Sequence, residues 1–301
     1  MLPTLRQLQY LKLLAEHGSF SRAAEAAHVS QPALSAGIQE LERTLGAPVV
    51  ERSRTQVILT PVGEEAVRRA TEVLAGAEDL VEAARSAGKP LSGRFRLGVI
   101  PTIAPFLLPR VLPVLRRRHP DLRLYLKEDL TPRLVSALKA GALDAAVIAL
   151  PYDLTGLAVA PMGQDEILAA APAGHRLAGG AAIDPRELAR DDLILLEDGH
   201  CLRDHALAAC NLEAPKGEDV FAATSLHTLM QMVGSGLGVS FVPRMAVEAG
   251  LADDERVAVR PLSAKAPVRE IVVAWRAGSS RAAEGRMLAE LMRETTTPLV
   301  A

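Results

Sequence analysis

The first sixty residues carry hydrophobic side chains at helical spacing in two long segments. Residues 4–16 predict an amphipathic helix, whose apolar positions are Leu5, Leu8, Leu11 and Leu14. A short alanine-rich helix follows and is capped by Ser19 or Ser21. A third helix is predicted to begin after the cap residue Ser30 and to end at Gly46. Its core face holds Leu34, Ile38, Leu41 and Leu45.

Polar side chains occupy the opposite face of this third helix. Two helices joined by a tight turn, the second with short polar residues, are typical of a helix-turn-helix. Gln31 can make two hydrogen bonds to adenine, and Ser35 can reach a base edge or a phosphate. Two short strands then place Arg52 and Arg54 as a wing beside a DNA backbone or minor groove. A small three-helix packing module with a solvated polar face is the alternative interpretation.

A long helix is predicted from Pro61 to about residue 87. Small apolar residues repeat along it in steps of four and three: Ala66, Ala70, Val73, Ala77, Leu80 and Ala84. The run would extend about 40 Å and needs a partner along its length, which favours a dimer seam over a helix lying on its own domain. Residues 88–93 then read as a hinge.

From Arg94 onward, segments with strand and helix patterns alternate, which predicts parallel α/β packing in two linked halves. The predicted strands are 95–100, 122–127, 145–150, 167–171, 192–196, 220–223, 239–242 and 270–275. The predicted helices are 107–118, 132–140, 202–209, 225–233 and 280–293. The glycines at 234–238 lack the third glycine of a dinucleotide-binding motif and precede a strand, so they indicate a helix-to-strand turn.

Composition narrows the class of protein without identifying it. The chain has 301 residues, 49% of them hydrophobic and 23% charged, with a formal net charge of −2. Any nucleic-acid contact must therefore come from a local patch. No signal peptide and no apolar window long enough for a bilayer are visible, so we expect no membrane association. The two cysteines and the absence of an export signal predict a cytoplasmic protein.

The two cysteines, Cys201 and Cys210, flank a segment of strong helix formers. Nine helical steps would separate their Cα atoms by about 13 Å, whereas a disulfide requires roughly 4.4–6.8 Å. A bond between the two sulfurs must therefore open the helix, which makes the segment a candidate redox switch. The alternative is two unrelated buried thiols.

The N-terminal sequence AEHGSFSRAAEAAHVSQPALSAGIQELERTLGAPVVERS, followed by LTPVGEE, resembles the winged helix-turn-helix of LysR-type transcriptional regulators. The resemblance implies an α/β multidomain protein: a winged helix-turn-helix at 1–60, a linker and dimerisation helix with a hinge at 61–89, and an effector domain at 90–301. The effector domain is expected to be two-lobed, periplasmic-binding-protein-like and Rossmann-like. Lobe I would comprise 90–164 and 270–301, and lobe II 165–269.

The same resemblance implies promoter DNA as a partner, a dimer formed through the linker helix, and a tetramer as the family expectation. The implied DNA-contacting positions are Ser30, Gln31, Pro32, Ser35, Arg52 and Arg54. Gly37 and Gln39 depart from the family, which commonly has a longer residue at the first position and a basic one at the second.

The sequence LLEDGHCLRDHALAAC, with ATSLHTL further along, is similar to the OxyR regulators, the hydrogen-peroxide-sensing branch of this type. The resemblance makes Cys201 the peroxidatic cysteine and Cys210 the resolving one. The implied peroxide pocket consists of Thr102, Thr131, His200 and Arg269. It also implies a cellular thiol reductant as a partner and neither a metal nor another cofactor.

The chemistry of these residues is consistent with that role. A thiol attacks peroxide only as a thiolate, so we expect the helix N-terminus and Arg269 to lower the pKa of Cys201. The Thr102 and Thr131 hydroxyls would hold the peroxide, and Cys210 would condense with the resulting sulfenic acid. One alternative is a LysR-type regulator of a small metabolite in the cleft between the lobes. Another is a thiol peroxidase, although an enzyme would leave the N-terminal helices without a role.

Overall fold

A computed structural model describes residues 2–52, 57–85, 89–188, 192–212, 222–263 and 267–296. The chain divides near residue 87 into an N-terminal unit and a C-terminal unit. Within the described residues, no helix is both long enough and apolar enough to cross a bilayer.

The N-terminal unit contains the three predicted helices, which are α1 (Leu5–His17), α2 (Phe20–Ala26) and α3 (Gln31–Leu45). Thr4 caps α1, and Ser30 caps α3 by accepting a hydrogen bond from the backbone of Ala33. Gly46 ends α3 in the left-handed conformation, at φ 73°. The prediction that Leu45 belongs to the core is wrong: it is 42% exposed, because it is the last residue of α3, where the chain turns away.

A hairpin and a long helix complete this unit. Strands β1 (Val50–Arg52) and β2 (Val57–Leu59) pair antiparallel, and α4 (Pro61–Arg85) follows. The predicted seam of α4 divides into two parts. Ala66 and Ala70 pack into the core of their own unit. Val73 and Leu80, further along, are 50% and 71% exposed in the single chain, so this second part is available to a partner helix.

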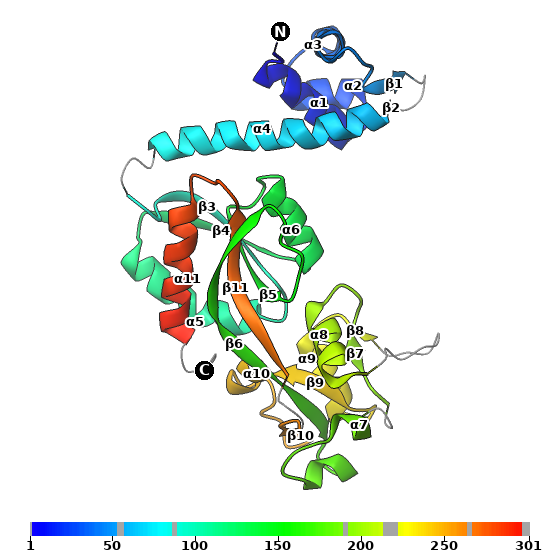
Figure 1. Ribbon diagram of the computed structural model, residues 1–301, viewed down its shortest axis with the longest axis vertical. Coiled ribbons are helices and arrows are strands. Elements are labelled where there is room, and N and C mark those ends of the chain that lie inside the picture. The colour runs from blue at the N-terminus through cyan, green and yellow to red at the C-terminus, as the bar shows by residue number, and fades with distance from the viewer. Residues whose placement is uncertain are drawn as a thin grey trace. The chain divides into compact units, whose positions relative to one another are not determined.

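The C-terminal unit is built on a mixed sheet with the order β10-β6-β11-β5-β3-β4, and β9 pairs with β6 (Figure 1). Its strands are β3 (Gly93–Val99), β4 (Leu122–Glu128), β5 (Ala145–Leu150), β6 (Leu157–Pro172), β9 (Ser240–Pro243), β10 (Val257–Arg260) and β11 (Val268–Arg276). Only β3, β4 and β5 pair in parallel among the described strands of this sheet. The predicted parallel packing is therefore confirmed for β3, β4 and β5. It does not extend to β6 and β11, which run antiparallel to each other and to the strands they pair with.

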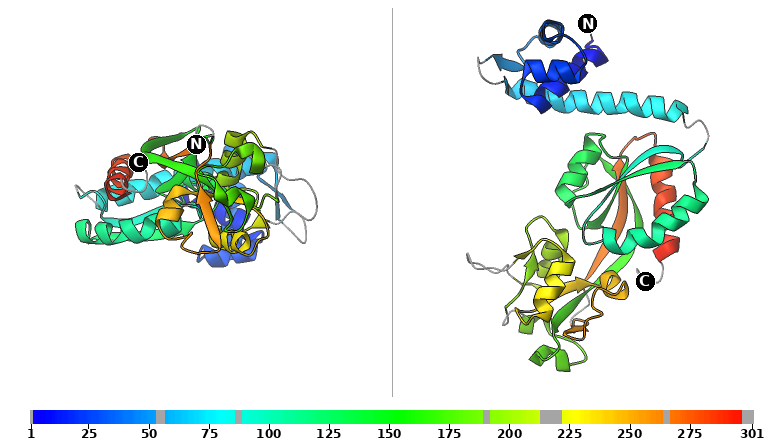
Figure 2. Two further views of the ribbon diagram at one scale, coloured as in Figure 1. Left: turned by 90° about the horizontal axis from the view of Figure 1, so that it is seen from below. Right: turned by 180° about the vertical axis from the view of Figure 1, so that it is seen from behind.

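The long strands β6 and β11 connect two lobes (Figure 1). In lobe I, α5 (Ala104–Arg118) packs against α11 (Ala282–Thr296), and α6 (Thr131–Lys139) covers the other face of the sheet (Figures 1 and 2). β11 pairs with β5, so the prediction that the last strand and helix return to the first half is confirmed.

Lobe II contains several short elements around the far ends of β6 and β11. They are η1 (Arg176–Gly179), α7 (Pro185–Leu188), β7 (Leu195–Leu196), α8 (Cys201–Cys210), β8 (Ala222–Ala223), α9 (Leu226–Gly234) and α10 (Arg244–Glu248). The predicted helix-to-strand turn joins α9 to β9. Gly238 in this turn allows close packing, because a Cβ there would lie 2.0 Å from the backbone oxygen of Asp192.

Candidate functional site

The two cysteines are the first and last residues of α8, which confirms the predicted helix between them. Leu, Arg and Ala dominate this segment, and these residues have high helix propensity. Both thiols are reduced and buried. Helical geometry separates their Cα atoms by about 13 Å, beyond the range of a disulfide. A Cys201–Cys210 bond therefore requires α8 to unwind.

Arg269, on β11, is fully buried and forms an ion pair inside the protein. Its Nε and Nη2 atoms donate to one carboxylate oxygen of Asp165, on β6, at 3.0 and 2.8 Å. The second carboxylate oxygen accepts a hydrogen bond from the backbone of Met245 at 3.0 Å. The guanidinium also donates to the hydroxyl of Thr102 at 2.8 Å and to its carbonyl at 3.1 Å. Arg269 and Thr102, both predicted, are thus in direct contact.

Sequence reasoning missed Asp165. It lies directly opposite Arg269 in the antiparallel register of β6 and β11. The sequence pattern placed the beginning of this strand at residue 167, so the register that joins the two charges could not be derived. An isolated buried arginine would be unfavourable, and Asp165 supplies the charge that makes burial of Arg269 possible.

Thr131, the first residue of α6, brings a hydroxyl to Cys201. The residue is buried, and the oxygen is close enough to the sulfur to lower the pKa of the thiol. The Thr131 hydroxyl and the Cys201 sulfur do not form a well-aligned hydrogen bond, and the hydroxyl has no other partner among the described residues. Three elements, α6, α8 and β11, thus surround Cys201 with a hydroxyl and a positive charge.

Burial nevertheless raises the pKa of Cys201 above its ordinary value of 9.0. The charge of Arg269 and the hydroxyl of Thr131 lower this pKa, while Asp204 raises it. The prediction that the site lowers the pKa of Cys201 is therefore wrong for this reduced conformation. The cost of removing a thiolate from water exceeds the attraction of a cation that Asp165 already partly neutralises.

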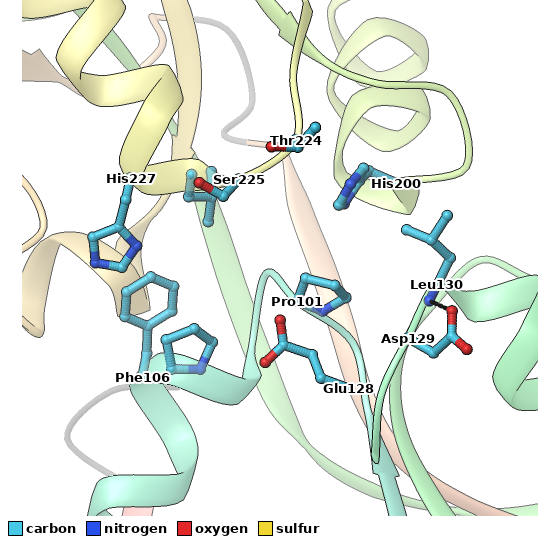
Figure 3. A pocket seen from close by; sticks show the side chains of 11 residues that line it. Pro101, Phe106, Glu128, Asp129, Leu130, His200, Thr224, Ser225 and His227 are labelled. Atoms are coloured by element: carbon cyan, nitrogen blue, oxygen red, sulfur yellow. Dashed lines mark hydrogen bonds between the residues drawn. The ribbon is translucent and has the colours of Figure 1, made fainter.

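His200 occupies a different position from the other predicted pocket residues. It is the N-cap residue of α8 and is buried, but its side chain makes no capping hydrogen bond. Burial lowers the pKa of its imidazole, and the nearby Glu197 opposes this shift. His200 lines a cavity of about 290 Å³ between the lobes, together with Phe106, Glu128, Ser225 and His227 (Figure 3). The described lining residues do not include Cys201, Thr102, Thr131 or Arg269.

Of the predicted DNA-contacting residues, Ser30, Gln31, Pro32 and Ser35 lie at the N-terminal end of α3, and Arg52 lies in β1. Gln31 and Pro32 are exposed and Ser35 is half-buried. Only the backbone of Arg52, in β1, is described, and Arg54 lies outside the described residues.

The departure at Gly37 has a structural reason. A Cβ at this position would lie 2.6 Å from the aromatic ring of Tyr10, on α1. Glycine therefore allows the Tyr10 side chain to occupy the space beside α3 where a longer residue would stand. Among the described residues, no group of three or more His, Cys, Asp or Glu side chains could hold a metal ion.

Two family models match almost the whole chain. Residues 5–64 match the bacterial regulatory helix-turn-helix protein, LysR family, and residues 88–297 match the LysR substrate binding domain. The chain belongs to the LysR family of transcription regulators. The fold described above, a helix-turn-helix unit followed by a two-lobed α/β unit, is the one these models represent.

Individual LysR-family proteins resemble the chain over nearly its full length. The HTH-type transcriptional regulator EstR of Acinetobacter baylyi is 39% identical over 300 residues, covering 99% of both chains. A probable hydrogen peroxide-inducible genes activator of Streptomyces viridosporus is 39% identical over 298 residues, covering 99% of this chain and 96% of the relative. The structure of a full-length OxyR from Pseudomonas aeruginosa, in which one cysteine is replaced by aspartate, has a TM-score of 0.76 and 39% identity, covering 97% of this chain and 98% of that one.

Proposed function

We propose that this LysR-family protein is a DNA-binding transcription regulator that senses hydrogen peroxide by reversible formation of a Cys201–Cys210 disulfide. The observation that carries the proposal is the placement of two buried thiols at opposite ends of one helix, with a buried cation and a hydroxyl at the Cys201 end. The similarity to proteins named as peroxide-responsive activators and to OxyR supports the same conclusion.

The first chemical step is the attack of the Cys201 thiolate on one peroxide oxygen. An S–O bond forms, the O–O bond breaks, and the leaving hydroxide takes up a proton and departs as water. The positive charge of Arg269 stabilises the negative charge that moves across the reacting atoms, and Thr102 and Thr131 offer hydroxyls to the peroxide. His200 directly precedes Cys201 in the chain and lines the cavity between the lobes. The product is a sulfenic acid on Cys201.

The second step joins the two sulfurs. The Cys210 sulfur attacks Cys201, an S–S bond forms, the S–O bond breaks, and a second water leaves. α8 must unwind before this step, which converts a chemical signal into a change of fold. Two electrons and two protons from a cellular thiol reductant then restore both thiols and the helix.

We propose that the signal reaches promoter DNA through a dimer, and that dimers pair into tetramers. Residues 1–60 form the DNA-binding domain, 61–89 the linker helix and hinge, and 90–301 the effector domain, with lobe boundaries at 165 and 270. The N-terminal end of α3 and the hairpin contact the duplex through Ser30, Gln31, Pro32, Ser35, Arg52 and Arg54. The exposed apolar residues of α4, including Val73 and Leu80, support a helix seam between two chains. The protein would act in the cytoplasm.

The test combines thiol mass spectrometry with DNA footprinting. Wild-type protein treated with one equivalent of peroxide should form an intramolecular Cys201–Cys210 bond and change its footprint. Cys201→Ser should do neither, whereas Cys210→Ser should stop at the sulfenic acid. Absence of the bond in the wild type would contradict the proposal, and continued peroxide consumption far beyond one equivalent with a reductant would indicate a thiol peroxidase instead.

A second candidate is a regulator of a small metabolite, because the cavity between the lobes, at about 290 Å³, has room for one. Its lining combines apolar residues such as Phe106 with the polar groups of Glu128, Ser225 and His227. If Cys201→Ser still responds to an inducing compound while peroxide leaves the wild-type footprint unchanged, this candidate replaces the first.

A further inference from the structure

His205 lies on α8 between the two cysteines, four residues after Cys201 and five before Cys210. Its Nε2 atom is 3.1 Å from the backbone oxygen of Pro151. A carbonyl oxygen can only accept a hydrogen bond, so Nε2 carries the hydrogen and donates it. Pro151 directly follows β5 of lobe I, whereas α8 belongs to lobe II. This hydrogen bond therefore ties the redox helix to the opposite lobe.

The helix depends on such tertiary contacts. A helix of ten residues is marginal by itself in water. At its N-terminus, the N-cap residue His200 provides no side-chain capping bond. Burial of Leu202, Ala206 and Leu207 holds the apolar face of the helix against lobe II. His205 adds a polar contact with a partner outside that lobe.

We propose that His205 is a positioning residue that latches the reduced helix to Pro151 and thereby slows the disulfide step. The inference rests on the function proposed above. Bringing the two sulfurs from about 13 Å into bonding range requires residues 202–209 to unwind, and His205 is in the middle of that stretch. The hydrogen bond to Pro151 must break before the S–S bond forms. It need not break before the S–O bond forms, so the latch acts on the second step.

The second nitrogen of the His205 ring, Nδ1, shows how strongly the ring depends on its contact with Pro151. Nδ1 of His205 is buried and has no hydrogen-bond partner among the described residues. Within the described parts of the chain, the ring is thus held by one polar contact, through Nε2. Loss of that contact leaves the Pro151 oxygen without the donor that His205 supplies.

The test uses full-length protein with His205→Ala and His205→Gln. Alanine removes the donor while raising the intrinsic helix propensity, so faster unwinding could not be attributed to propensity. Glutamine keeps an amide donor that can reach a carbonyl and is the matched control. Sulfenic acid is trapped with dimedone and disulfide by rapid alkylation, and both are timed by mass spectrometry. Hydrogen exchange of residues 202–209 is measured in the reduced proteins.

We expect His205→Ala to form the disulfide about three to ten times faster than wild type, with sulfenic acid formation unchanged within about twofold. Its α8 amides should exchange faster by a similar factor, and His205→Gln should resemble wild type. If His205→Ala forms the disulfide at the wild-type rate and its α8 amides exchange at the wild-type rate, the proposal of a latch is wrong. An equal change in both chemical steps would also overturn it and would make His205 a partner of the Cys201 sulfur. If wild type forms no Cys201–Cys210 bond, the proposed function fails, while hydrogen exchange in the reduced proteins still decides on the latch.

Discussion

The two ends of α8 hold the same side chain in different surroundings. Burial raises the pKa of both thiols, that of Cys210 to about 11. At the Cys210 end, burial is the sole cause of the shift. At the Cys201 end, the charge of Arg269 and the hydroxyl of Thr131 oppose it. The groups that oppose the shift at Cys201 therefore come from β11 and α6, whereas Asp204, on α8 itself, raises the pKa of Cys201 further.

This comparison shows how one helix can carry two chemically distinct thiols. The helix sets the separation of the sulfurs, which prevents the disulfide while the protein is reduced. In the proposed function, the elements packed around its N-terminal end prepare one sulfur for reaction with an oxidant. Under the same proposal Cys210 needs no such preparation, since it meets a sulfenic acid only after the helix has opened.

The largest expected effect comes from removing the cation at the Cys201 end. Arg269→Met would leave the buried carboxylate of Asp165 without its partner, and breaking a buried pair in this way costs roughly 3–5 kcal/mol. The same variant should lose most of its reactivity with peroxide. Urea unfolding measures the first effect, and the rate of sulfenic acid formation measures the second.

The matched control for Arg269→Met is the double variant Arg269→Met/Asp165→Leu. It removes both charges, so most of the stability should return while the low reactivity remains. Arg256→Met, at an exposed ion pair with Asp254, should leave both measurements unchanged. If Arg269→Met alone unfolds at the wild-type urea concentration, the buried pair does not have the structural role assigned to it.

A smaller effect, about a hundredfold over two pH units, is expected for the first chemical step. Because the pKa of Cys201 is raised above 9.0, its thiolate fraction grows about tenfold for each unit between pH 6 and pH 8. The rate of sulfenic acid formation should follow that fraction in stopped-flow measurements at constant ionic strength. A rate independent of pH above 7 would mean that the reacting conformation differs from this one and holds Cys201 as a thiolate.

The sequence was sufficient for features that depend on local patterns. Helix α8, the cap at Ser30 and the stop at Gly46 follow from propensity and capping residues. The resemblance named Arg269, Thr102 and Thr131, and the structure brings all three into one buried region around Cys201. Their chemical roles stay predictions.

Features that depend on register and burial could not be derived in this way. The partnership of Asp165 with Arg269 arises only when β6 and β11 align, and most of β6, including Asp165, was not recognised as a strand. The direction of the pKa shift at Cys201 depends on how completely water is excluded, and a sequence pattern does not show this. The antiparallel half of the sheet was missed for a related reason, since alternation of elements does not reveal strands that cross between lobes.

The smallest effect is expected for Thr131→Val, which removes the hydroxyl at the Cys201 end and keeps the shape of the side chain. Loss of the hydroxyl should raise the pKa of Cys201 further and slow sulfenic acid formation by about three- to tenfold. Stability should stay the same or increase by up to about 1 kcal/mol, because a buried hydroxyl without a hydrogen-bond partner is replaced by a methyl group.

Thr131→Ser, which keeps the hydroxyl, should react at nearly the wild-type rate. A variant that is slower and also less stable would mean that Thr131 supports the packing of α6 and not the sulfur. If the rate of sulfenic acid formation falls while the stability rises, the Thr131 hydroxyl serves the chemistry of Cys201 at a cost in stability. Burial alone shifts the pKa of Cys210, so no equivalent hydroxyl among the described residues acts at that end of α8.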